Sequence, residues 1–419
     1  MPFSAPRATP SRRARRRFSA TLSESGSWGF PRTAAARPGS KGRRRQMDIK
    51  LNDDQLEISR QARRFFENET PMEYVRAMFE DEKGFTDEIW GKMAELGWTA
   101  MCIPEAYDGL GLELLDLAVV LEEMGRAVVP GPFFSTVMLG GGGLAEAGSD
   151  AQKKEFLPRL AAGEIRGTLA LHEPDAGGDL DYVRMEAKAE GGGFVLEGTK
   201  VFVPDAHVSD FLVVPALAKD GLTLFLVESG ASGLAVSPLP TMDGTRKLCV
   251  VEFGGVEVGR DAVLAAPGQG NAPLDRALRR AQVGLCAECV GGAQKAMEVA
   301  TEYAQVRIQF DQPIGAFQAI KHRCAQMYVE VESARSILYW AAWAQDHAEE
   351  EAAMAASVAK AYCSEMFTRT AASAIQVLGG TGFSWEHDIH FYLKRAKANE
   401  AALGDPVYHR ERIAGLLAG

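Results

Sequence analysis

The spacing of apolar residues along the chain changes twice. After an N-terminal extension, apolar positions recur at helical intervals, as where Ile58, Ala62 and Phe66 share one face. The period then falls to two, and in Val183–Ala189 apolar positions alternate with charged ones, which is typical of a half-buried strand. From about Ala272 helical spacing returns and continues to the end. This order predicts an α+β fold of three domains: α-helical over 47–163, an antiparallel β-barrel or sandwich over 164–271, and a four-helix-bundle-like domain over 272–419.

Local signals place the elements within these domains. Asn52, followed by Gln55 three residues later, forms a capping-box-like helix start, and Pro71 ends that helix. We expect further helices over Thr86–Leu96 and Leu114–Gly125. Besides the alternating stretch, β-rich runs predict strands over Phe194–Glu197, Lys200–Val203, Phe211–Val214, Leu222–Val227 and Leu248–Phe253.

Composition is typical of a water-soluble globular protein. The 419 residues, 46% of them hydrophobic, are enough for two or three cores. No apolar run reaches the length of a membrane span, so we expect no membrane insertion. The six cysteines stand in apolar or helical contexts, which indicates reduced thiols in a reducing compartment. Cys286 and Cys289 form a C-x-x-C with no second pair, and we interpret them as core residues.

Charge separates the first 46 residues from the rest. They hold 12 Lys or Arg and one acid, Glu24, a net charge of +11, which leaves −21 for the remainder. Such a Ser- and Arg-rich segment cannot bury a core, so 1–46 is predicted to be a basic disordered extension. It is either an upstream extension of the reading frame, with a cytoplasmic protein starting at Met47, or a transit peptide to the mitochondrial matrix. A nucleic-acid partner is disfavoured because the remaining chain is acidic.

The stretch Arg307–Gln318 interrupts two long helical patterns and carries candidate chemistry. Asp311, Pro313 and Gly315 break the helix, so we expect a loop. A guanidinium offers a planar fork for phosphate oxygens, and glutamine amides can bind an adenine edge or a ribityl chain. A nucleotide cofactor fits this set of groups. The alternative is an arginine that caps a helix before an ordinary bend.

A second segment, Gln376–Gly382, reads Q-V-L-G-G-T-G. Together the two segments resemble the acyl-CoA dehydrogenase family, whose C-terminal domain contains R-x-x-F-G-x-P-[IL]-x-x-F-Q followed by Q-x-x-G-G-x-G. The resemblance runs from about Met47 to the C-terminus. It implies FAD as cofactor, an acyl-CoA thioester as substrate, an electron-transfer flavoprotein as electron acceptor, and a tetrameric assembly.

The same resemblance implies FAD contacts in the middle domain. The family signature A-x-T-E-P-x-A-G-S-D corresponds to 170–179, where His172 replaces a Thr or Ser that hydrogen-bonds the flavin. A histidine can still donate to a flavin carbonyl, although an ordinary turn residue is the alternative. Phe202 stands at the ring-stacking position, whereas Pro204 removes the usual donor to flavin N5. The implied cofactor residues of this domain are Leu171, His172, Gly177, Gly178 and Phe202.

In the C-terminal domain, the resemblance implies that the loop reaches FAD bound mainly by a neighbouring subunit. Asp311 stands where the family usually has Gly, and an acid near a pyrophosphate must point away from it. The glycines of the second motif permit close backbone approach to the pyrophosphate. The implied cofactor residues here are Arg307, Gln309, Phe310, Gln318, Gln376, Gly379 and Gly380.

The chain departs from the family at the catalytic base. The family removes the substrate α-proton with a Glu carboxylate in a dry pocket while the β-hydride passes to the flavin. At the two positions that carry this Glu in the family, the present chain has Leu403 or Gly404 and Ala281. We expect Asp405 to be the base, with Glu400 as second choice. The alternative for Asp405 is a helix cap before Pro406.

Three functions therefore stay open. The first is FAD-dependent α,β-dehydrogenation of an acyl-CoA by a homotetramer. In the second, the chain is a catalytically incomplete subunit of a heterotetramer whose homologous partner supplies the base; Gly382–His390 resembles the branch acting on steroid or ring-bearing CoA esters. The third is a flavin-dependent oxidase or monooxygenase. His387 and His390 lack a third ligand, and we expect no metal.

Overall fold

The computed structural model describes residues 50–418, so the predicted basic extension over 1–46 lies outside the described residues. The N-terminal domain is helical, as predicted. The expected capping box at Asn52 is present, with Asn52 Oδ1 accepting from the Gln55 amide at 2.8 Å. Its helices are α2 (Asp53–Glu69), α3 (Met72–Glu80), α4 (Asp87–Glu95), η1 (Trp98–Ala100), η2 (Glu105–Tyr107), α5 (Leu114–Arg126), the π-helical η3 (Ser135–Gly141), α6 (Gly142–Ala147) and α7 (Asp150–Ala161).

The middle domain is a single eight-stranded sheet with the order β6-β7-β3-β2-β4-β5-β8, and β1 pairs with β4. The strands are β1 (Gly167–Leu169), β2 (Glu186–Glu190), β3 (Gly193–Pro204), β4 (Phe211–Ala218), β5 (Gly221–Glu228), β6 (Leu234–Leu239), β7 (Leu248–Val258) and β8 (Val263–Leu264), with short helices η4 (Ala206–Val208) and η5 (Arg260–Ala262). Most pairings are antiparallel, as expected, but β1–β4 and β2–β4 are parallel. The sheet is therefore more mixed than the sequence indicated.

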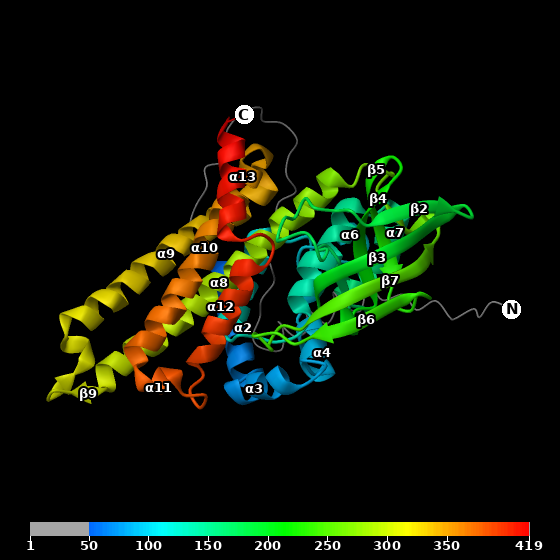
Figure 1. The fold of residues 1–419 in the computed structure, drawn as a ribbon. Coiled ribbons are helices and arrows are strands. Elements are labelled where there is room, and N and C mark those ends of the chain that lie inside the picture. Colours follow the sequence, from blue (N-terminus) through cyan, green and yellow to red (C-terminus); the bar gives the residue numbers. More distant parts are fainter. Residues whose placement is uncertain (1–49, 419) are drawn as a thin grey trace.

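The C-terminal domain is the predicted helical bundle. Figure 1 shows its long helices running away from the sheet, so that the sheet and the far ends of the helices lie at opposite ends of the molecule. Its elements are α8 (Asn271–Val306), the hairpin β9 (Ile308–Gln309) and β10 (Gln312–Pro313), η6 (Ile314–Ala316), α9 (Gln318–His347), α10 (Glu349–Leu378), α11 (Gly380–Phe383), α12 (Ile389–Ala401) and α13 (Pro406–Ala418).

Helix α8 crosses α5 of the N-terminal domain at backbone contact. A Cβ at Gly291 would overlap the carbonyl oxygen of Glu122, and one at Gly125 would overlap the backbone of Glu288. Both positions therefore require glycine. One continuous core joins the two helical domains, and the apolar interior of the sheet forms a second core.

Arg395 on α12 ties the three domains together. Its side chain is fully buried, and its Nε donates to Asp243 Oδ2 at 2.8 Å in the middle domain. Its Nη2 donates to the Val129 carbonyl at 3.2 Å in the N-terminal domain, and its Nη1 lies 3.4 Å from Glu288 on α8. Arg246 binds the same Glu288 through both carboxylate oxygens. A buried charge is costly unless it is paired in this way.

Replacing Arg395 with Met should leave two buried carboxylates without their shared cation. Breaking a buried ion pair costs about 3–5 kcal/mol. We expect a loss of this size in the free energy of unfolding, measured by urea denaturation. The control is Lys397→Met, two residues along α12, where the cation is 45% exposed and the loss should stay within about 0.5 kcal/mol. Equal losses in the two variants would contradict this role for Arg395.

Candidate functional site

A buried ion pair shapes the predicted FAD segment of the middle domain. Lys200 Nζ donates to Glu173 Oε1 at 2.7 Å and to the Leu171 carbonyl at 3.3 Å. Glu173 also accepts the backbone N–H groups of Arg184 and Met185. These bonds fix the chain from Leu171 to Glu173 against β3, in the conformation that presents His172.

His172 is held by its backbone while its ring stays available. Its carbonyl accepts the Val201 N–H at 2.8 Å, and no described residue hydrogen-bonds its ring nitrogens. Burial, and then the charge of Lys200, lowers the pKa of the imidazole. The ring is therefore neutral at pH 7, with one donor and one acceptor that suit a flavin carbonyl or ring nitrogen.

The remaining middle-domain positions offer an open surface. Phe202 is 57% exposed with φ 54°, at a bulge where the β3–β7 register shifts between Lys200 and Val203. Gly177 and Gly178 both have positive φ, and no atom lies within 4 Å of a Cβ built on either. A ring and a loop with free backbone access fit the FAD that the sequence predicts.

The second predicted set lies on the hairpin between α8 and α9. Phe310 is 84% exposed and makes an edge-to-face contact with Phe317, with ring centroids 5.9 Å apart. Among the described residues, no carboxylate forms an ion pair with Arg307, so this exposed guanidinium is free to bind an anion. Gln309 is exposed too, and Gln318 Nε2 lies 3.4 Å from His322.

The glycine-rich motif lies at the same end of the bundle. Gln376 is exposed near the end of α10, and Gly379 (φ 62°) and Gly380 both have open space where a Cβ would stand. Figure 1 shows β9 and α11 together at the end of the helices away from the sheet. Nearby, Arg76 of α3 donates to Asp388 and to the carbonyls of Trp385 and Glu386, which secures the segment that follows α11.

One chain holds its two predicted sets of FAD residues apart. Helix α8 begins beside β5, where the Gly270 N–H donates to the Leu222 carbonyl, and it ends at Val306, just before Arg307. Arg246, which precedes β7 near the Pro204 end of β3, binds Glu288 in the middle of this helix. From Glu288 to Arg307 the chain runs 19 residues, or about 28 Å at 1.5 Å per residue. The hairpin therefore lies well away from the predicted flavin residues of the same chain (Figure 1).

Neither predicted base lies in a dry pocket. Asp405 is exposed, and its Oδ1 accepts the Tyr408 N–H at 2.8 Å, so it caps α13. Burial raises the pKa of Glu400, but hydrogen bonds from Thr368 (2.5 Å) and Lys397 (2.9 Å) outweigh this effect and leave the pKa below its ordinary value. Leu403 and Ala281 are buried apolar residues.

The structure also gathers three side chains that sequence reasoning did not single out. Gln282, Lys360 and His409 are fully buried and converge on the backbone of the Leu403–Gly404 turn. They come from α8, α10 and α13, so no local motif connects them. The only sequence signal is their polarity within otherwise apolar helical faces.

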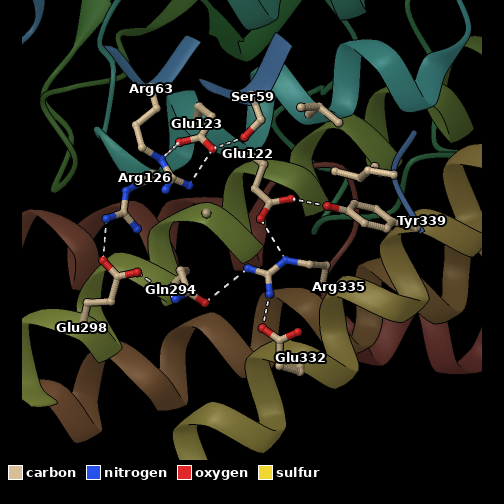
Figure 2. Close-up of a pocket in the computed structure, with 13 residues that line it drawn as sticks. Ser59, Arg63, Glu122, Glu123, Arg126, Gln294, Glu298, Glu332, Arg335 and Tyr339 are labelled. Atoms are coloured by element: carbon tan, nitrogen blue, oxygen red, sulfur yellow. Dashed lines mark hydrogen bonds and ion pairs between the residues drawn. The ribbon is translucent and has the colours of Figure 1, made fainter. Parts of the chain in front are cut away.

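A separate cavity of about 260 Å³ lies between the N-terminal helices and the bundle (Figure 2). Its charges pair with one another: Arg63 binds Glu123, Arg126 binds Glu298, and Arg335 binds Glu122. None of the predicted FAD or base residues lines it. The cavity is thus lined by ion pairs at the boundary between two domains, and it is separate from the predicted FAD site.

Comparisons with known proteins agree with these features. The chain matches family models for the N-terminal domain (52–164), the middle domain (168–256) and the C-terminal domain (268–417) of acyl-CoA dehydrogenases. Acyl-CoA dehydrogenase IpdE2 of Mycolicibacterium smegmatis is 33% identical over 343 residues, covering 81% of this chain and 91% of the relative.

Solved structures extend the comparison. The ChsE4–ChsE5 complex of Mycobacterium tuberculosis contains a chain 28% identical, with a TM-score of 0.82 and coverage of 89% and 99% of the two chains. The FAD complex of PigA has a similar chain at 26% identity, with a TM-score of 0.83 and coverage of 89% and 99%. Both matches span all three domains.

Fold, site and comparisons together define an FAD-dependent oxidoreductase that acts on CH–CH donors. The chain belongs to the acyl-CoA dehydrogenase family. The predicted family, three-domain fold and FAD cofactor are confirmed. Within residues 50–418, no helix is both long and apolar enough to cross a membrane.

The buried His409 gives the turn a pH dependence. Burial lowers the pKa of its imidazole from 6.5 to about 4. Below pH 6.5 the unfolded chain takes up a proton that the folded chain refuses until about pH 4, so His409 makes stability fall as the pH drops through this window. Replacing His409 with Gln keeps a donor for the Leu403 carbonyl and removes the titration. We expect a shallower decline in unfolding free energy between these pH values, and parallel curves for wild type and variant would contradict it.

Proposed function

We propose that this chain is a subunit of an acyl-CoA dehydrogenase in which two chains complete each FAD site. The reaction is α,β-desaturation of an acyl-CoA thioester, with electrons passed on to an electron-transfer flavoprotein. The observation that carries the proposal is the separation of the two FAD sets along α8, from the sheet to the Arg307 hairpin. A second chain is needed to bring an Arg307 hairpin to a His172 segment.

The hairpin end of the bundle is suited to contact with another chain. Four apolar side chains there are between 53% and 84% exposed: Val306, Ile308, Phe310 and Phe383. Clustered exposed apolar residues are unusual on a free surface and typical of interfaces. The assembly is a homotetramer or a heterotetramer with a homologous subunit.

Each group has a defined part in this site. FAD supplies the hydride acceptor when bound. Arg307 from one chain neutralises pyrophosphate charge, and the Gly379–Gly380 backbone allows its close approach. His172 and Phe202 from the other chain hydrogen-bond and stack on the ring system. The Lys200–Glu173 pair keeps that second segment in place.

The missing base favours a heteromeric assembly. A carboxylate strong enough to remove a thioester α-proton is a desolvated one with a raised pKa. Asp405 is exposed and caps a helix, and the pKa of Glu400 is lowered. We therefore infer that a homologous partner supplies the base, and that this chain contributes its hairpin and FAD-binding segments.

A second candidate is a flavin-dependent oxidase or monooxygenase of the same fold. The observation that favours it is the altered flavin surround, where His172 and Pro204 replace the residues that the family usually has. Oxygen consumption coupled to flavin reoxidation would support this candidate, whereas reoxidation only by an electron-transfer flavoprotein would support the dehydrogenase.

Replacing Arg307 with Ala should weaken FAD binding by the assembled protein. Loss of one charge-assisted hydrogen bond costs about 1.5–3 kcal/mol, or roughly a tenfold to hundredfold change in affinity. FAD per chain is measured by absorbance after gel filtration. The control is Arg60→Ala, a 64% exposed arginine of α2, which should keep full FAD. Full FAD in Arg307→Ala would contradict the shared site.

Replacing Asp405 with Asn separates the two sources of the base. Asparagine caps a helix about as well as aspartate, so the fold should persist. With a partner-supplied base, flavin bleaching by acyl-CoA in the co-expressed assembly should be unchanged. A loss of about 10²–10⁴-fold would instead make Asp405 the base. In the complementary variant, Leu403→Glu, the chain purified alone should gain bleaching that wild type alone lacks.

A further inference from the structure

The turn between α12 and α13 has a costly backbone conformation. Leu403 has φ 56° and Gly404 has φ 89°, so two consecutive residues are left-handed. Glycine adopts this region freely, but a bulky residue such as leucine does so only when its surroundings enforce it. Gly404 cannot be larger, because a Cβ would lie 2.6 Å from the Tyr408 ring and 2.8 Å from His409 Nε2.

Three buried side chains enforce this conformation. Lys360 Nζ on α10 donates to the Gly404 carbonyl at 2.8 Å and to the Glu400 carbonyl at 3.3 Å. Two donors share the Leu403 carbonyl: Gln282 Nε2 on α8 at 3.3 Å and His409 Nε2 on α13 at 2.9 Å. Side chains on three helices therefore donate to the backbone carbonyls of this turn. We refer to Gln282, Lys360 and His409 as the turn clamp.

The turn clamp departs from what stability alone favours. Lys360 is fully buried, yet within residues 50–418 no carboxylate forms an ion pair with it, and burial lowers the pKa of its amine. Gln282 Oε1 and His409 Nδ1 are buried with no hydrogen-bond partner in the same part of the chain. A strained residue, a buried amine with no carboxylate in an ion pair and two unpaired acceptors lie together. Such departures cluster where a protein needs a set geometry for function.

The turn also lies near the strands that carry the predicted flavin residues. Asn399, four residues before Leu403 in the chain, accepts a hydrogen bond from Arg246 Nη1 at 3.4 Å. Arg246 just precedes β7, whose Leu248 pairs with Pro204 at the end of β3 that carries Phe202. The turn and Phe202 therefore approach the same part of the middle domain.

We propose that Gln282, Lys360 and His409 are positioning residues that hold the Leu403–Gly404 turn as a wall of the acyl-CoA site. The inference rests on the proposed function, because it assigns the turn to the same reaction. None of the three touches the reacting atoms. They act through the turn, whose backbone and buried Leu403 set where the thioester lies relative to the flavin.

The test uses the assembled, FAD-loaded protein with co-expressed partner. Lys360→Met keeps the length of the side chain and removes its donors. His409→Phe removes the donor to Leu403, whereas His409→Gln retains one. The control is Ser357→Ala, a buried residue one turn earlier on α10. The rate of flavin bleaching is measured against acyl-CoA concentration, alongside FAD per chain.

We expect Lys360→Met and His409→Phe to keep FAD and to lower the bleaching rate at saturating acyl-CoA at least tenfold. His409→Gln should recover most of the rate, and Ser357→Ala should match wild type. Unchanged rates in Lys360→Met and His409→Phe would overturn the inference, as would equal losses in His409→Phe and His409→Gln. If Lys360→Met does not fold, the two His409 variants decide. Failure of wild type to bleach with any acyl-CoA would instead overturn the proposed function.

Discussion

The structure depends on one buried positive charge. The guanidinium of Arg395 is fully buried, so its N–H groups need acceptors from the protein in place of water. Those acceptors come from all three domains: Val129, the pair Asp243 and Thr245, and Glu288. Rotation of one domain relative to the others would separate this charge from one of its acceptors. Arg395 therefore links the orientations of the three domains that the sequence predicts.

Much of the architecture was predictable because it follows from the spacing of apolar residues along the chain. The change of period from helix to strand and back gave the three domains, and the capping box at Asn52 gave the first helix start. Helix α3 is absent from the sequence prediction, because Pro71 marks the end of one helix and is also the N-cap of the next. The parallel pairing of β1 with β4 is absent from it for a different reason. It joins Gly167 to Phe211, and no short-range pattern encodes a partner so far along the chain.

The candidate site divides in the same way. Residue types and motifs are enough to predict Arg307, His172 and the glycines as site residues, because the chemistry of each can be inferred without its neighbours. The distance between them could not be predicted, since it depends on the unbroken length of α8 and on how the helix packs against the sheet. The turn clamp was beyond sequence reasoning altogether. Lys360 and Gly404 lie 44 positions apart and have meaning only once α10 and α13 are packed.

The placement of the hairpin has a thermodynamic consequence. In the proposed assembly, FAD binds to two chains at once, so cofactor binding and subunit association are linked and each strengthens the other by the same free energy. Dilution of the protein then releases cofactor, and loss of cofactor promotes dissociation, even though no residue of either chain has changed. Flavin content then depends on protein concentration as well as on sequence.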